Sequence, residues 1–251
     1  MSVRRTLDLL EQYELKAKKK YGQNFLVDEK IIQKITDTVE AGENVIEVGP
    51  GLGALTGGLL QKAGKLTAYE IDSDLVEILK RQFPDEKLEL INEDFLKAEL
   101  PEGRSVLVSN LPYYVTGDIL LKCFREKDKL DRMTVMMQKE VADKFFAEGY
   151  EYGILNVLAD LYSEYRIICK ADRHCFIPAP NVDSTVMEFV FNDRNCDEDF
   201  CNFLEACFRQ RRKLLSGNLK KAGYQLNKDL GKTRVDELSP EELWRLYEEV
   251  K

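Results

Sequence analysis

The chain is poor in the residues and runs that mark several common protein classes. Its 251 residues contain a single histidine, His174, and six cysteines that form no Cys-x-x-Cys pair. A zinc site would lack its usual ligand spacing, so we expect no metal and mostly buried, reduced thiols. No apolar run approaches the roughly 18 residues that cross a membrane, and the first residues lack the apolar core of a signal peptide. We therefore expect a cytoplasmic protein with no membrane contact.

The chain also lacks an overall excess of basic charge, because its formal net charge is −8. RNA binding depends on lysine and arginine, which displace counterions from phosphates, so this total argues against an RNA partner. The charge is unevenly distributed, however: residues 1–25 sum to +3 and residues 199–225 to +4, which leaves −15 elsewhere. Two solvated helix faces would explain these segments, and two RNA-binding patches are the alternative.

Strands and helices of about ten residues alternate through most of the chain. The expected strands are 44–48, 66–71, 88–91, 105–108 and 133–138, with 165–170 and 184–191 as a closing pair at the sheet edge. This order predicts an α/β fold with a doubly wound, mostly parallel sheet that binds ligands at the carboxyl ends of its strands. From Asn192 onward the pattern is helical and charged. We expect a main domain over residues 1–192 and a small helical domain over residues 193–251.

A glycine-rich segment, Glu47-Val-Gly-Pro-Gly-Leu-Gly53, lies between an expected strand and an expected helix. Glycines at such a turn let backbone amides approach a bound nucleotide closely. Glu70 ends the next strand, where a carboxylate can accept from both ribose hydroxyls. Asp94 follows the third strand and can accept from an adenine amino group, with Phe95 near the ring. This order predicts a nucleoside site, but the glycine pattern alone suits NAD as well as S-adenosylmethionine.

The tetrapeptide Asn110-Leu-Pro-Tyr113 follows the fourth expected strand and favours methyl transfer to adenine. The amine of adenine is a poor nucleophile that becomes positive when it attacks a sulfonium methyl, so hydrogen-bond acceptors must face it. The side-chain oxygen of Asn110 and the backbone carbonyl of Leu111 can fill this role, and Pro112 fixes the chain in an extended form. Tyr113 offers a flat face for stacking the base. No strong general base is needed, since the methylated amine readily loses its proton to water.

A target adenine must leave its stack to reach a buried methyl donor, so a second aromatic residue is expected opposite Tyr113. Phe176 is the candidate, because it stands in Phe-Ile-Pro-Ala-Pro-Asn-Val-Asp-Ser184, a loop that two prolines make stiff. A phenylalanine that simply belongs to the hydrophobic core is the alternative.

Taken together, these motifs resemble the ribosomal RNA adenine dimethyltransferases, and among them the small-subunit enzymes that dimethylate two adjacent adenines near the 3′ end. The resemblance runs from KKKYGQNFL at residues 18–26 through EVGPGLGALT, YEID, NEDF, NLPYYVTGDIL, QKEVADKF, YGILNVLADLY and FIPAPNVDSTV to FRQRRKLLSGNL at residues 208–219. It implies a Rossmann-like class I methyltransferase domain, S-adenosylmethionine as cofactor, and a small C-terminal helical domain that helps to grip RNA.

The resemblance also implies individual roles. Cofactor contacts are expected from Asn24, Leu26, Gly49, Gly51, Glu70, Ile71, Asp94, Phe95 and Asn110, with the methionine part near Asn24 and Leu26. Asn110, Tyr113 and Phe176 are the expected catalytic residues, the last two as a stacking pair. RNA contacts are expected from Lys18, Lys19, Lys20, Arg209, Arg211, Arg212 and Lys213.

Two departures keep alternatives open. The segment NLPYYVTGDIL has Tyr114 and Gly117-Asp118 where the small-subunit enzymes usually have Asn-Ile-Ser-Thr-Pro, which is similar to the drug-resistance methyltransferases of large-subunit RNA. Ser216-Gly217 likewise replaces an asparagine-rich stretch, whereas Val182-Asp-Ser184 favours the small-subunit group. A ribosome-assembly factor that binds RNA without needing its chemistry is a second hypothesis, and an NAD-dependent oxidoreductase is a third. The sequence does not determine which adenines are modified, how many methyl groups are added, whether the substrate is free RNA or an assembled subunit, or the oligomeric state, for which we expect a monomer.

Overall fold

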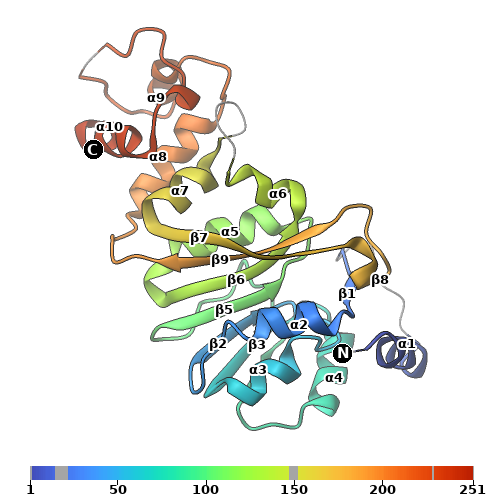
Figure 1. Ribbon diagram of the computed structural model, residues 1–251. Helices are drawn as coiled ribbons and strands as arrows, with labels where there is room; N and C mark the ends of the chain where they lie inside the picture. Colours follow the sequence, from blue (N-terminus) through green and yellow to red (C-terminus); the bar gives the residue numbers. More distant parts are fainter. Residues whose placement is uncertain (1, 15–21, 147–151, 228, 251) are drawn as a thin grey trace.

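A seven-stranded sheet forms the centre of the protein, seen here in a computed structural model that describes residues 2–14, 22–146, 152–227 and 229–250. In spatial order the strands are β4 (Leu88–Ile91), β3 (Lys65–Tyr69), β2 (Asn44–Val48), β5 (Ser105–Asn110), β6 (Leu130–Gln138), β9 (Ser184–Phe191) and β7 (Ser163–Ala171). The first five are parallel, and β9 pairs antiparallel with both β6 and β7. The predicted doubly wound, mostly parallel sheet and its closing pair are confirmed (Figure 1).

The central strands read as continuous apolar runs because helices cover both faces of the sheet. Successive side chains of a strand point to opposite faces, so Val106 of β5 joins one buried cluster and Leu107 joins the other. Helices α2 (Glu29–Thr36) and α3 (Thr56–Lys62) pack on the first face. Helices α5 (Thr116–Arg125) and α7 (Ile154–Tyr162) pack on the second. The remaining short elements are α4 (Ser73–Gln82), α6 (Lys139–Lys144) and the 3₁₀ turns η2 (Lys127–Lys129), η4 (Arg173–Cys175) and η5 (Val235–Glu237).

A small second ladder joins two segments that are distant in the sequence. Strand β1 (Phe25–Leu26) pairs antiparallel with β8 (Phe176–Ile177), where sequence patterns predict only loops. The N-terminal segment is thereby held beside the loop that follows β7. Helix α1 (Val3–Gln12) precedes this ladder in the chain.

The chain after Phe191 is helical, as predicted, and stacks beyond α7 at one end of the molecule (Figure 1). It comprises α8 (Glu198–Phe208), α9 (Leu215–Lys221) and α10 (Pro240–Val250). The predicted boundary at residue 192 falls between β9 and α8, and its standing as a domain division stays a prediction. One buried cluster contains both Phe124 of α5 and Phe200 of α8, so the hydrophobic core continues across this point.

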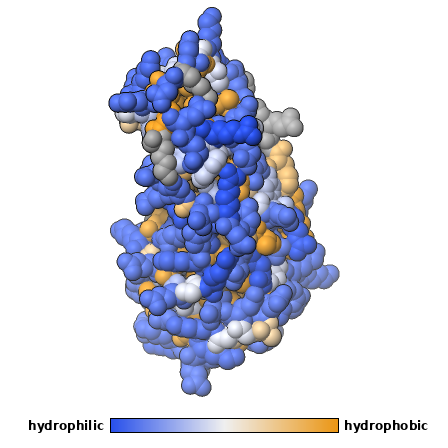
Figure 2. Space-filling view, turned by 90° about the vertical axis from the view of Figure 1, so that its left-hand side faces the viewer, coloured by the Kyte–Doolittle hydropathy of each residue, from blue (hydrophilic) through white to orange (hydrophobic). Residues whose placement is uncertain are grey.

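The surface is that of an ordinary globular protein on the side shown in Figure 2, where hydrophilic residues dominate and hydrophobic ones are scattered. Within the described residues, no helix combines the length and the hydropathy needed to cross a bilayer. Four of the six cysteines are buried, in line with the expected buried thiols.

Candidate functional site

A cavity of about 330 Å³ lies at the carboxyl ends of four neighbouring strands, in the order β4, β3, β2 and β5. Neighbouring strands are about 4.8 Å apart, so the cavity wall extends over about 14 Å along this edge. Of the predicted site residues, the wall contains Asn24, Leu26, Gly49, Gly51, Glu70, Ile71, Asp94, Phe95, Asn110 and Tyr113. The structure thus brings together every predicted cofactor residue and two of the three predicted catalytic residues.

The glycine turn after β2 requires conformations that other residues rarely adopt. Gly49 and Gly51 have φ values of 63° and 62°, in the left-handed region. Gly53, at φ 82°, also faces a steric limit, because a Cβ atom there would lie 2.3 Å from Cε2 of Phe83. The turn therefore depends on glycine, and it brings backbone amides to the cavity wall.

Glu70 links the glycine turn to the strand beside it. Its Oε2 accepts from the backbone N–H of Gly51 at 3.0 Å, and its Oε1 accepts from that of Asp72 at 2.9 Å. Burial raises the pKa of the Glu70 carboxyl, and these two hydrogen bonds act in the opposite direction. A buried carboxylate held in one orientation at a strand end is suited to accept hydrogen bonds from a ribose.

The outer end of the cavity, after β4, combines one acceptor with apolar surface. Asp94 lies in the wall, and its Oδ1 accepts from the backbone N–H of Leu96 at 3.1 Å. Phe95 is buried edge-on against Tyr69, with ring centroids 5.5 Å apart. Ile71 lines the same cavity with 41% of its surface exposed, which is unusual for an isoleucine next to a buried strand. A flat apolar ligand in the cavity would cover it.

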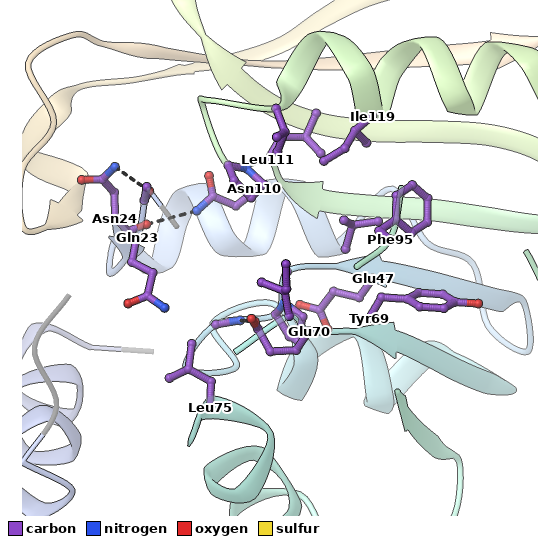
Figure 3. A pocket seen from close by; sticks show the side chains of 18 of the residues that line it. Gln23, Asn24, Glu47, Tyr69, Glu70, Leu75, Phe95, Asn110, Leu111 and Ile119 are labelled. Atoms are coloured by element: carbon purple, nitrogen blue, oxygen red, sulfur yellow. Dashed lines mark hydrogen bonds between the residues drawn. The ribbon is translucent and has the colours of Figure 1, made fainter. Parts of the chain in front are cut away.

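The opposite end of the cavity, after β5, carries the Asn-Leu-Pro-Tyr loop. The Nδ2 of Asn110 donates to the backbone carbonyl of Asn24 at 3.3 Å, which fixes the orientation of the amide and leaves its oxygen to accept (Figure 3). The N–H of Leu111 donates to the carbonyl of Met136 on β6 at 3.0 Å, so the loop is anchored to the sheet. Within the described residues, no donor is bound to the Asn110 side-chain oxygen or to the Leu111 carbonyl. The two acceptors that the sequence predicts, the Asn110 side-chain oxygen and the Leu111 carbonyl, are therefore available to a ligand.

Tyr113 lies half-buried in the cavity wall, and its hydroxyl is 2.7 Å from Oγ of Ser184. Burial raises the pKa of this phenol, so the ring is neutral at physiological pH. The hydrogen bond joins the Asn-Leu-Pro-Tyr loop to the Val-Asp-Ser motif that begins β9. Two motifs 71 residues apart in the sequence thus hold one aromatic ring in place.

Phe176 is the predicted site residue that the structure does not bring to the cavity. Its ring is only 3% exposed and belongs to the buried cluster that includes Leu26 and Val186. Pairing of β8 with β1 places the residue beside the segment that lines the cavity, with its side chain in the core. This placement matches the alternative of a core phenylalanine, and its stacking role stays a prediction.

Glu47 is a cavity residue that sequence analysis did not single out. It is 1% exposed, and its Oε2 accepts from the hydroxyl of Thr56 at 2.8 Å. Burial and the nearby Glu70 raise the pKa of the Glu47 carboxyl to about 8. A charged residue inside the otherwise apolar strand Asn44–Val48 was the available sequence signal.

Thr6 of α1 is a second residue that sequence analysis missed. It lies in the cavity wall although α1 precedes the sheet by more than 30 residues. Its hydroxyl is fully buried and has no hydrogen-bond partner among the described residues. A buried donor without a partner is costly to the folded state. No sequence pattern indicated that α1 would reach this cavity.

The predicted RNA-binding residues fall into three groups. Lys18, Lys19 and Lys20 lie outside the described residues. Arg209, Arg212 and Lys213 are exposed in the segment that follows α8. Arg211 is half-buried and donates to the backbone carbonyl of Tyr152, so it links the segment after α8 to the segment before α7.

The chain that carries this ordered set of strand-end residues matches a known protein family over most of its length. The family model described as ribosomal RNA adenine dimethylase matches residues 14–251. The chain belongs to this family. An adenine dimethyltransferase acting on ribosomal RNA, with a class I methyltransferase fold, is therefore confirmed, and the oxidoreductase hypothesis is excluded.

Similar proteins cover most of the chain. It is 42% identical over 218 residues to ribosomal RNA small subunit methyltransferase A of Mycoplasma mobile, covering 84% of this chain and 85% of that one. The protein of the same name from Clostridioides difficile is 40% identical over 242 residues, covering 89% and 83%.

Two solved structures show the same fold. The dimethyladenosine transferase of Plasmodium falciparum superposes with a TM-score of 0.73 at 22% identity, covering 88% of this chain and 95% of that one. The 23S rRNA methyltransferase ErmE superposes with a TM-score of 0.66 at 29% identity, covering 90% and 99%.

Proposed function

We propose that this protein transfers methyl groups from S-adenosylmethionine to N6 of two adjacent adenines near the 3′ end of small-subunit (16S) ribosomal RNA, within a pre-assembled subunit, during ribosome biogenesis. The observation that carries the proposal is the continuous cavity from Glu70 and Asp94 at one end to Asn110 and Tyr113 at the other. The small-subunit assignment is supported by the names of relatives at about 40% identity.

The cavity wall fits a cationic nucleoside cofactor. Glu47 and Glu70 are two buried carboxyls in the cavity wall, and burial raises the pKa of each. Positive charge nearby would favour their ionised forms, so they suit the sulfonium and ammonium groups of S-adenosylmethionine. The ribose would lie against Glu70, the adenine between Ile71 and Asp94, and the methionine part near Asn24.

The chemistry follows from the acceptors at the β5 end. When bound, the cofactor supplies an electrophilic methyl group on its sulfonium. The Asn110 side-chain oxygen and the Leu111 carbonyl accept the two hydrogens of the adenine amine, favour a tetrahedral nitrogen and stabilise its developing positive charge. Because Asn24 already holds the Asn110 amide, little reorganisation is needed at the moment of reaction. Tyr113 stacks on the base and positions it, and the product amine releases its proton to water.

The substrate RNA would be bound by the basic segment Arg209–Lys213 and by lysines 18–20. Structured RNA is recognised mainly through its backbone and shape, so clustered cations suit it. The exposure of Arg209, Arg212 and Lys213 supports this role despite the acidic total charge.

The direct test is incubation with radiolabelled S-adenosylmethionine and small subunits from a strain that lacks the modification, with large subunits in a parallel reaction, followed by mapping of the labelled nucleotides. We expect label at N6 of two adjacent adenines near the 3′ end. Label on large-subunit RNA alone would instead support the drug-resistance alternative. Tight RNA binding without any label would support the assembly-factor hypothesis.

A further inference from the structure

Tyr114 is an exposed aromatic residue in the cavity wall that has no role in the proposed chemistry. It directly follows Tyr113 in the loop between β5 and α5, and 55% of its surface is exposed. Among the described residues, only Ile71 is another large, exposed hydrophobic side chain in the cavity wall. Part of the apolar surface of Tyr114 therefore faces solvent, and a ligand could cover it.

The ring of Tyr114 lies against the N-terminal segment. A Cβ atom on Gly22 would be 3.2 Å from Cδ1 of Tyr114, so the ring packs on the bare backbone of that glycine. Gly22 has a φ of 58° and begins the segment that carries Asn24. One part of the ring is thus supported by backbone, while more than half of the residue surface is exposed. A supported ring loses little conformational entropy when it binds a ligand.

The strand order indicates which ligand the Tyr114 ring can contact. Ile71 and Asp94 follow β3 and β4, whereas Tyr114 follows β5, at the other end of the row. A cofactor that places its adenosine at β3 and β4 has its reactive methyl at β5. Tyr114 therefore lies on the side where the RNA enters.

We propose that Tyr114 stacks on the nucleobase next to the target adenine in the RNA strand. This inference rests on the proposed function of the cavity. Extrusion of an adenine leaves its neighbour without a stacking partner, and an aromatic side chain beside Tyr113 replaces it. The ligand is an unstacked nucleotide of single-stranded RNA, recognised through its ring face and so with little base preference.

The experiment compares Tyr114→Leu, which keeps apolar volume but lacks a flat ring, with Tyr114→Phe. Phe146→Leu is the matched control, because Phe146 is 54% exposed and lies outside the cavity wall. Steady-state methyl transfer gives kcat and KM for the RNA, and calorimetry gives the Kd for S-adenosylhomocysteine. A second binding assay uses RNA with 2-aminopurine beside the methylated adenine, whose fluorescence is quenched by stacking.

Tyr114→Leu should raise the KM and Kd for RNA by about tenfold, within the range that base–aromatic stacking supports. The quenching should be lost, while kcat and the Kd for S-adenosylhomocysteine should change less than about twofold. Tyr114→Phe and Phe146→Leu should behave like the wild type. An unchanged RNA affinity and unchanged quenching in Tyr114→Leu would overturn the inference, and so would a loss confined to cofactor binding.

Methylation by the wild type distinguishes the two proposals. If the wild type methylates unmodified small subunits and Tyr114→Leu equals it in every readout, only the inference on Tyr114 fails. If the wild type binds the small subunits but transfers no methyl group to them, the proposed function fails and the inference fails with it.

Discussion

Replacement of Glu47 by glutamine should change how the stability of the protein depends on pH. Glu47 is buried, and its pKa in the folded protein is raised to about 8 from an ordinary value of 4.5. Between these two values the folded chain holds a proton that the unfolded chain has released. The free energy of unfolding therefore falls as the pH rises, and the stabilising contribution of the protonated carboxyl is lost as the pH passes the folded pKa.

The size of the effect follows from the same linkage. One such group changes the free energy of unfolding by about 1.4 kcal/mol per pH unit, hence by about 3 kcal/mol between about pH 5.5 and 7.5. For a chain of this length that corresponds to about 5–10 °C in Tm. Glu47→Gln has no proton to lose at this position and can still accept from the Thr56 hydroxyl. The Tm of Glu47→Gln minus the Tm of the wild type should therefore increase by about 5–10 °C between about pH 5.5 and 7.5.

Differential scanning calorimetry of both proteins without cofactor, at several pH values, is the assay. Glu89→Gln is the matched control: Lys65 lowers the pKa of this carboxyl, so it stays ionised throughout the interval. The Tm difference between Glu89→Gln and the wild type should be independent of pH. A pH-independent difference for Glu47→Gln as well would refute the reasoning. Added S-adenosylmethionine should reduce the pH dependence of the wild type, because its positive charge favours the ionised carboxyl.

Three further substitutions test separate parts of the account. Gly53→Ala should lower the free energy of unfolding by about 2 kcal/mol more than Gly103→Ala. Both glycines have φ values near 80°, but only a Cβ atom at Gly53 would clash, with the ring of Phe83. Equal losses of stability on urea titration would contradict this steric explanation. Thr6→Val should leave the protein without cofactor at least as stable by calorimetry, since it removes a buried hydroxyl that has no partner among the described residues, and a loss of more than about 1 kcal/mol would contradict this. Arg212→Glu should weaken RNA binding and reduce the slope of log K against log salt by about 1, whereas an unchanged slope would mean that this arginine only contacts solvent.

Sequence patterns predicted the sheet and most of the cavity because both depend on local regularities. The expected strands 88–91 and 184–191 have the observed bounds, since alternating or continuous apolar runs end at clear turn residues. The cofactor residues that follow β2, β3, β4 and β5 came together because the carboxyl ends of parallel strands must share one edge, whereas Asn24 and Leu26 were expected only from the family resemblance. The order of motifs along the chain thus determined the order of side chains along the cavity.

The rest depends on contacts between segments far apart in the sequence. Nothing in the pattern around Phe176 shows that its strand pairs with Phe25–Leu26 and turns the ring into the core. The raised pKa of Glu47 requires knowledge of its burial and of the nearby Glu70. Thr6 reaches the cavity only through the packing of α1, which no local pattern encodes.

The central claim is that the loop from Asn110 to Tyr113 holds an adenine amine at the methyl donor. Single-turnover methyl transfer to unmodified small subunits by Asn110→Ala, with the Kd for S-adenosylhomocysteine measured in parallel, tests it most directly. The account predicts a rate at least about 100-fold below that of the wild type, with a Kd raised less than about tenfold. A variant that methylates the same adenines at the wild-type rate would contradict it.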